Sequence, residues 1–254
     1  MFNQFVYQPI FEFLIFLNNL FGQNFGLAII SLTLVIRLVL VPLTLPALRS
    51  AQKMRVLKPK LDALKNKHSK DKAALQQAQL KLYKSENINP AAGCLPYIIQ
   101  FIVLIALYRV FIDFLSNGNI DGQSINLNFL WFNLADPDKT YALPIITGLT
   151  QLILGVLVLP GADTAAEKTL AQKTKTKTDD KKAQDATEMA QTMQQQMVIV
   201  MPIMTIFLAA RFPSALSLYW FITTLFSLVQ QYLVSGWGGL ALYLTKLKQF
   251  VVKK

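Results

Sequence analysis

Charged residues are scarce in this chain, and several residue types on which common activities depend are almost missing. Only 15% of the 254 residues are charged, against about 25% in soluble domains. The single cysteine, Cys94, excludes an internal disulfide framework, and the single histidine, His68, leaves little for a histidine-based site. The sequence also has no phosphate-binding glycine loop, HExxH motif or pair of catalytic carboxylates. We therefore expect no enzyme activity, no catalytic residues, no cofactor and no metal.

Apolar and basic residues are abundant instead. Hydrophobic residues make up 53% of the chain, with 17 phenylalanines, and 25 Lys and Arg face 14 Asp and Glu for a net charge of +11. A basic chain of this size could bind nucleic acid, but the apolar content favours a membrane protein with basic faces and no specific DNA partner.

Five segments are apolar enough to form membrane-spanning helices, each needing about 20 residues to cross a bilayer core of about 30 Å. They are residues 22–48, 91–115, 140–160, 196–211 and 213–235. The fourth is short, so either the polar residues Gln191–Gln196 continue its helix beyond the lipid or the bilayer thins there. Residues 1–21 lack a basic start and a cleavage site, which favours an interfacial amphipathic helix over a signal peptide.

The connecting segments differ in charge, which predicts the orientation. Lys and Arg concentrate in residues 49–88, 161–195 and 236–254, whereas 116–139 contains three Asp and one Lys. Basic segments stay in the cytoplasm, so the N-terminus lies outside and the C-terminus inside. Apolar residues at helical spacing predict an antiparallel hairpin of two short helices in 49–88, with a kink or a late start at Pro59. The expected fold is an all-α membrane protein with five transmembrane helices, an N-terminal interfacial amphipathic helix and a cytoplasmic helical hairpin.

Arg37 is the most informative residue because it lies in the middle of an apolar span. A guanidinium there costs several kcal/mol unless it meets water or a partner. It could form an ion pair with Asp113 or Glu12, but both acids lie towards the outer edge. The alternative, which we favour, is a water-filled cavity in which Arg37 meets a passing acidic group, with Thr33 one turn earlier on the same face.

Other candidates each have two interpretations. Gln100 either lines such a cavity or bonds a neighbouring helix, and Tyr219 and Trp220 either anchor the interface or face the cavity. The basic residues of the hairpin either touch anionic lipid or bind ribosomal RNA phosphates. They are Arg49, Lys53, Arg55, Lys58, Lys60, Lys65 and Lys67.

Several stretches, in this order and with a basic hairpin after the first span, resemble the YidC-type membrane protein insertases of bacteria, which have relatives in mitochondria and chloroplasts. The resemblance rests on Asn24–Ile29 with Arg37 and Pro42-Leu43, Asn89–Pro96 with Gln100 and Leu107-Tyr108, Met201–Met204, Phe212-Pro213, Leu218–Trp220 and Gln230–Tyr232. Three positions depart from the family pattern: Phe101 replaces a proline, Ser214-Ala215 an Ala-Gly pair, and Thr224 a frequent asparagine.

The resemblance implies a five-span bundle around a hydrophilic groove that is open to cytoplasm and lipid and closed outside. Arg37, Thr33, Gln100 and Trp220 would line the groove, and we add the neighbouring Tyr219. The implied function is insertion and chaperoning of nascent membrane proteins, without a chemical step, in the bacterial cytoplasmic membrane. The hairpin would recruit clients or a targeting receptor, and the tail lysines Lys246, Lys248, Lys253 and Lys254 would touch the ribosome.

The Sec translocon and the signal recognition particle receptor are further candidate partners, besides membrane lipids. Two other functions remain open at this point. One is a small anion transporter or channel that uses Arg37 as an anion site, although the sequence has no matching internal repeat. The other is a non-enzymatic assembly factor that docks partners through the basic hairpin.

Overall fold

The computed structural model describes residues 3–68, 71–86, 95–117, 119–120, 123–158 and 186–236. A short π-helical turn, η1 (Asn3–Tyr7), precedes the helices α1 (Gln8–Leu20), α2 (Phe25–Val56), α3 (Lys58–Lys67), α4 (Lys72–Ser85), α5 (Leu95–Asn117), α6 (Ala142–Val158), α8 (Ala186–Ala209) and α9 (Ser214–Ser235). Between α5 and α6 lie four two-residue strands: β1 (Asn119–Ile120), β2 (Gln123–Ser124), β3 (Asn128–Phe129) and β4 (Phe132–Asn133). They pair as two antiparallel hairpins, β1–β2 and β3–β4, which the all-α expectation omitted.

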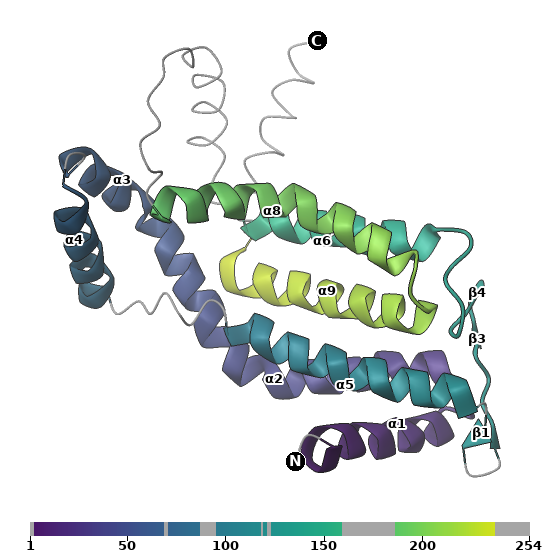
Figure 1. The fold of residues 1–254 in the computed structure, drawn as a ribbon. Coiled ribbons are helices and arrows are strands. Elements are labelled where there is room, and N and C mark those ends of the chain that lie inside the picture. Colours follow the sequence, from purple (N-terminus) through teal and green to yellow (C-terminus); the bar gives the residue numbers. More distant parts are fainter. Residues whose placement is uncertain are drawn as a thin grey trace.

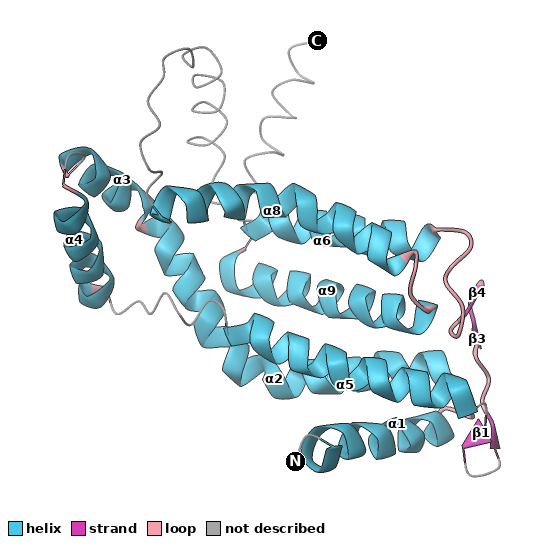
Figure 2. Cartoon of the chain, viewed as in Figure 1, coloured by secondary structure: helices cyan, strands magenta, loops and turns pink. Residues whose placement is uncertain are grey.

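The helices form two groups that meet at α9. Helix α9 packs against α6 and α2, α8 packs against α6, and α1 packs against α2. Figure 1 shows α6, α8 and α9 on one side and α2 and α5 on the other, with α3 and α4 at one end. The strands and the connecting loops gather at the opposite end of the bundle (Figure 2).

Helix α2 is longer than its predicted span, which was residues 22–48. It continues through Pro42 and Pro46 to Val56 without interruption. By length and composition, its segment Phe25–Met54 is the one helix of the described chain that is long and apolar enough to cross a membrane. Ala142–Val158 and Val198–Ala209 are apolar but shorter.

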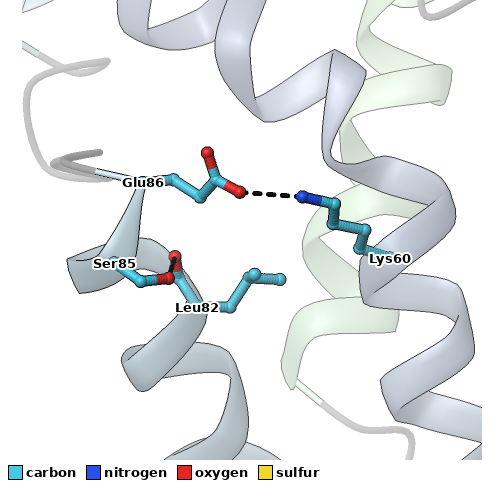
Figure 3. A network of polar contacts seen from close by, with 4 residues as sticks. All are labelled: Lys60, Leu82, Ser85 and Glu86. Carbon is cyan, nitrogen blue, oxygen red and sulfur yellow. Dashed lines mark hydrogen bonds and ion pairs between the residues drawn. The ribbon is translucent and has the colours of Figure 1, made fainter.

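Helices α3 and α4 pack against each other through a small apolar contact. Leu57, Leu61 and Leu75 are buried there, and Pro59 falls in the first turn of α3, where a missing N–H costs no helical hydrogen bond. An ion pair between Lys60 Nζ and Glu86 Oε1, at 2.9 Å, joins the start of α3 to the end of α4 (Figure 3).

Helix α8 contains the short fourth apolar segment and the polar residues before it. The helix begins at Ala186, so residues 191–196 are part of it. It lies close to α6 because Gly148 leaves room: a Cβ at this position would come within 2.3 Å of Ile206 Cγ1.

The buried core lies at the end of the bundle that carries the strands. It combines Phe25 of α2, Leu107 of α5, Leu134 of the connecting loop and Leu216 of α9, all nearly inaccessible. Elsewhere the helices expose many large apolar side chains, including Phe101, Ile199 and Phe207 at just over 60% each. Soluble monomers rarely expose apolar surface on this scale, and it suits contact with lipid or with other apolar chains.

The loop before α6 is held by a buried aspartate. Asp138 is only 3% exposed; its Oδ1 accepts hydrogen bonds from Thr140 N (3.0 Å) and Thr140 Oγ1 (2.6 Å), and its Oδ2 accepts one from Leu143 N (2.8 Å). Burial acts to raise the pKa of this carboxyl, but the hydrogen bonds from Thr140 and Leu143 prevail and lower it. The aspartate thus fixes the entry into α6.

The same loop also caps α9. Backbone N–H groups of Ser214 and Ala215, at the start of α9, donate to the carbonyls of Asp136 and Leu134 at 2.9 and 3.1 Å. The Ser214 hydroxyl adds a second bond to the Asp136 carbonyl at 2.7 Å. The first N–H groups of a helix have no hydrogen-bond partner within it. The loop carbonyls accept from two of these N–H groups in α9, and they connect the start of α9 to the start of α6.

Candidate functional site

A chain of hydrogen bonds joins three helices through three polar side chains. Arg37 of α2 donates from Nη2 to Gln100 Oε1 of α5 at 2.7 Å. Gln100 Nε2 in turn donates to the hydroxyl of Tyr219 of α9 at 2.5 Å. The structure therefore brings together three of the five residues that the sequence proposed for a groove.

The position of Arg37 follows from the periodicity of α2. Phe25, Ile29 and Thr33 lie four residues apart on one face, and each is at most 1% exposed. Arg37 is the next residue in this row, and it is half-buried. The helix therefore directs the guanidinium towards the other helices and not away from them.

Among the described residues, no acid neutralises the charge of Arg37. No carboxylate of the described residues forms an ion pair with it. Asp113 instead accepts a hydrogen bond from the Tyr7 hydroxyl, and Glu12 is exposed and accepts one from Gln8 Nε2. The ion pair considered from the sequence is therefore absent from the described structure. Gln100 solvates the guanidinium through a neutral amide, so the positive charge persists.

Thr33 and Trp220 lie apart from this hydrogen-bonded chain. The Thr33 hydroxyl donates to the Ile29 carbonyl one turn earlier at 2.6 Å, within the buried face of α2. Trp220 packs edge-on against Phe212, with ring centroids 6.3 Å apart, and Phe212 packs edge-on against Tyr108 of α5 at 6.2 Å. This aromatic contact joins the turn between α8 and α9 to α5.

A second polar link between α2 and α9 was not assigned a role from the sequence. Gln230 Nε2 donates to Thr44 Oγ1 at 3.0 Å, and Thr44 is buried. A glutamine in an apolar helix is the signal that could have pointed to it, by the same reasoning that singled out Gln100. Two polar contacts, seven residues apart along α2, therefore lie on the surfaces that face α5 and α9.

The structure describes some of the basic residues that the sequence predicts to contact partners. Arg49, Lys53, Lys60 and Lys67 are exposed, and Lys60 forms the ion pair with Glu86. The side chains of Arg55, Lys58 and Lys65 and the tail residues Lys246, Lys248, Lys253 and Lys254 lie outside the described part of the structure. Within the described part, no group of three or more His, Cys, Asp or Glu side chains could hold a metal ion.

The family model and the similar proteins all point to one family. The family model of the 60Kd inner membrane protein matches residues 16–238. Membrane protein insertase YidC 2 of Bacillus anthracis is 34% identical over 238 residues, covering 92% of this chain and 81% of that protein. Membrane protein insertase MisCA of Bacillus subtilis (strain 168) is 34% identical over 238 residues, with 92% and 79% covered. Membrane protein insertase YidC of Fusobacterium nucleatum is 34% identical over 242 residues, with 92% and 99% covered.

A solved structure has the same fold. It is that of an active YidC insertase with its first transmembrane domain resolved, at a TM-score of 0.59 and 28% identity. The match covers 91% of this chain but 46% of the other, so the present chain spans less than half of that protein. Because the family model and the relatives each cover most of the sequence, the chain belongs to the 60Kd inner membrane protein family, together with the YidC and MisCA insertases.

Proposed function

We propose that this chain is a membrane protein insertase and chaperone, which moves short N-terminal tails and transmembrane segments of nascent proteins into the bilayer through a hydrophilic groove. The observation that carries the proposal is the guanidinium of Arg37, held by Gln100 and without an acidic partner among the described residues. The insertase names of the relatives support the same function. In this proposal Arg37, Gln100 and Tyr219 form the polar centre of the groove, and Thr33 and Trp220 belong to its walls, outside the hydrogen-bonded chain.

In this proposal α2, α5, α6, α8 and α9 all span the bacterial cytoplasmic membrane. The basic residues of α3 and α4 and the aspartates of the loop before α6 support an orientation with the hairpin and the C-terminus in the cytoplasm and the N-terminus outside. The N-terminal segment, residues 1–21, lies in the outer interface. The loop that caps α6 and α9 then closes the groove on the outer side.

The groove lowers the cost of moving polar groups across the hydrocarbon. An acidic client tail about 4 Å from Arg37 gains roughly 4 kcal/mol of gross attraction at an effective dielectric constant of about 20. A membrane potential that is positive outside adds roughly 2.3 kcal/mol per negative charge for 100 mV. The apolar segment of the client then moves into lipid, driven by hydrophobic transfer at roughly 25 cal/mol per Å². No covalent step is required.

The partners follow from this role. Nascent membrane proteins are the clients, and the ribosome, the Sec translocon and the signal recognition particle receptor are partners on the cytoplasmic side. The exposed basic residues of the hairpin and the lysines of the tail supply positive charge for these contacts and for anionic lipid.

The test is insertion of a single-span client with an acidic N-terminal tail into proteoliposomes, scored by protease protection of the translocated tail. We compare the wild type with Arg37→Ala and Arg37→Lys. The wild type and the lysine variant should protect the tail, and the alanine variant should not. Arg211→Ala is a matched control, because Arg211 is exposed in the turn after α8 and stacks over Phe207 at 5.3 Å.

Each outcome separates the alternatives. If the folded wild type inserts no client, the proposed function fails, and anion flux through the same vesicles tests the transporter. If Arg37→Ala inserts the client as well as the wild type does, the electrostatic groove fails, and docking through the hairpin becomes the better account. If lysine does not replace arginine, the planar geometry of the guanidinium on Gln100 is required.

A further inference from the structure

A second polar cluster lies on α5 about half a helical turn around from Gln100. Here α5 and η1 enclose an open cavity of about 410 Å³, lined by Asn3, Tyr7, Tyr108, Arg109, Ile112 and Asp113. In the proposed orientation this cavity lies near the outer end of α5, on the face away from the groove.

The two charges of the cavity have opposite signs and different surroundings. Arg109 is exposed, and a guanidinium carries five N–H donors, more than one neighbouring group can accept. Asp113 is half-buried, and its Oδ2 accepts a hydrogen bond from the Tyr7 hydroxyl. Burial, followed by the hydrogen bond to Asp113 and its charge, raises the pKa of Tyr7 to about 12. Tyr7 therefore keeps its proton at neutral pH and ties η1 to α5 beside Arg109.

An apolar stripe leads along α5 to this cavity. Ile98, Ile102 and Ile105 are 56%, 42% and 37% exposed, and they precede Arg109 at spacings that place all four on one face. From Ile98 to Arg109 the helix rises roughly 16 Å. A polar cavity with charges of both signs therefore sits at the outer end of an apolar track that runs towards the middle of the bilayer.

We propose that this cavity binds the headgroup of an outer-leaflet phospholipid. The phosphodiester contacts the Arg109 guanidinium, a hydrogen-bond donor of the headgroup contacts the Asp113 carboxylate, and an acyl chain lies along the isoleucine stripe. The inference rests on the proposed function in one respect: it takes α5 to span the membrane with Asn117 outside.

The acid next to the arginine determines which lipids fit. A free phosphate ion would be repelled by Asp113, whereas a headgroup that carries an ammonium or a hydroxyl supplies a donor to it. Phosphatidylethanolamine and phosphatidylglycerol have such donors, and phosphatidylcholine has none. Both polar contacts involve a charged partner, which makes them stronger than neutral hydrogen bonds.

The test measures lipid retention by native mass spectrometry on the full chain, released from phosphatidylcholine nanodiscs that contain a minor fraction of phosphatidylethanolamine or phosphatidylglycerol. The wild type should retain either minor lipid in preference to phosphatidylcholine. Arg109→Gln should retain each of them roughly tenfold less, the loss expected for one charge-assisted contact. Asp113→Asn keeps an oxygen that can accept from Tyr7, so it should fold and lose only the preference over phosphatidylcholine. Arg211→Gln, at another exposed arginine, should behave as wild type.

Equal retention of all three lipids by the wild type, or unchanged retention by Arg109→Gln, would overturn the lipid site. Retention of inorganic phosphate alone would overturn it as well. Client insertion is measured on the same preparations. If the wild type inserts clients but shows no lipid preference, the lipid site is wrong and the proposed function stands. If the wild type shows the lipid preference but inserts no client, the lipid site stands and the proposed function is wrong.

Discussion

Replacing Asp138 by asparagine should destabilise the outer end of the bundle, although the residue is remote from Arg37. Thr140 and Leu143 donate three hydrogen bonds to the buried carboxylate, one of them from Leu143 N to Oδ2 at 2.8 Å. Asparagine keeps one oxygen but places an NH₂ group opposite that N–H, so two donors face each other. Losing a hydrogen bond to a buried charged group costs roughly 1.5–3 kcal/mol, which corresponds to a fall of roughly 3–12 °C in the unfolding midpoint for a chain of this size.

The effect should also depend on pH in a defined direction. The folded-state pKa of Asp138 is lowered from its usual value, so its stabilisation is complete above the unfolded-state pKa of about 3.9 and is lost as the pH falls through the folded-state value. The difference in midpoint between wild type and Asp138→Asn should be full at pH 7 and shrink below about pH 4. Asp136→Asn is the matched control, because Asp136 binds α9 through its backbone carbonyl only, and it should change stability by less than about 0.5 kcal/mol. Equal midpoints for the two variants at pH 7 would refute this reasoning.

Three further predictions concern helix contacts and can be read from thermal unfolding in detergent. Gly148→Ala should cost about 1–3 kcal/mol, because its Cβ would overlap Ile206 of α8; an unchanged midpoint would mean that α6 and α8 lie farther apart. A double-mutant cycle of Thr44→Val and Gln230→Leu should give a coupling energy of about 0.6 kcal/mol, typical of side-chain bonds between membrane helices, whereas additive effects would argue against their hydrogen bond. Lys60→Ala should lower stability by less than about 1 kcal/mol, because its ion pair is exposed to water; a larger loss would show that the pair holds the hairpin together.

The sequence identifies the polar residues of the site better than it identifies their contacts. Arg37 and Gln100 stand out because a polar residue in an apolar run requires a partner or water, and this cost is a property of the residue and its neighbours in sequence. Tyr219 does not stand out in this way, because tyrosines are common at membrane interfaces and need no buried partner there. That its hydroxyl meets Gln100 depends on the rotation of α9 about its axis, which packing determines. Packing also decides the different roles of Thr33 and Arg37, which lie one turn apart on the same face of α2. Thr33 is buried and bonds its own helix, whereas Arg37 reaches Gln100 of α5.

The fold shows a similar division between local and tertiary features. The apolar segments coincide with helices of the described structure, but they do not show how far each helix continues: α2 passes through Pro42 and Pro46 and beyond the span predicted to end at residue 48. The role of Asp138 is not predicted from the sequence, where this residue only contributes to the acidic charge of the loop. A local signal existed: an aspartate two residues before a threonine and shortly before an apolar run is typical of a helix start. The capping of α9 by the same loop joins residues far apart in sequence and has no such signal.

The unbroken α2 helix has a mechanical consequence for the hairpin that it carries. At 1.5 Å per residue α2 is roughly 48 Å long, about 18 Å more than a hydrocarbon core of about 30 Å, so it holds α3 and α4 at the end of a long helical arm. Pro42 and Pro46 each remove one backbone hydrogen bond, and because they lie four residues apart on one face, bending is easiest in a single plane. A bend of about 10° at Pro46 would displace Val56 by roughly 3 Å. A bend at these prolines would therefore move the hairpin sideways in a defined direction.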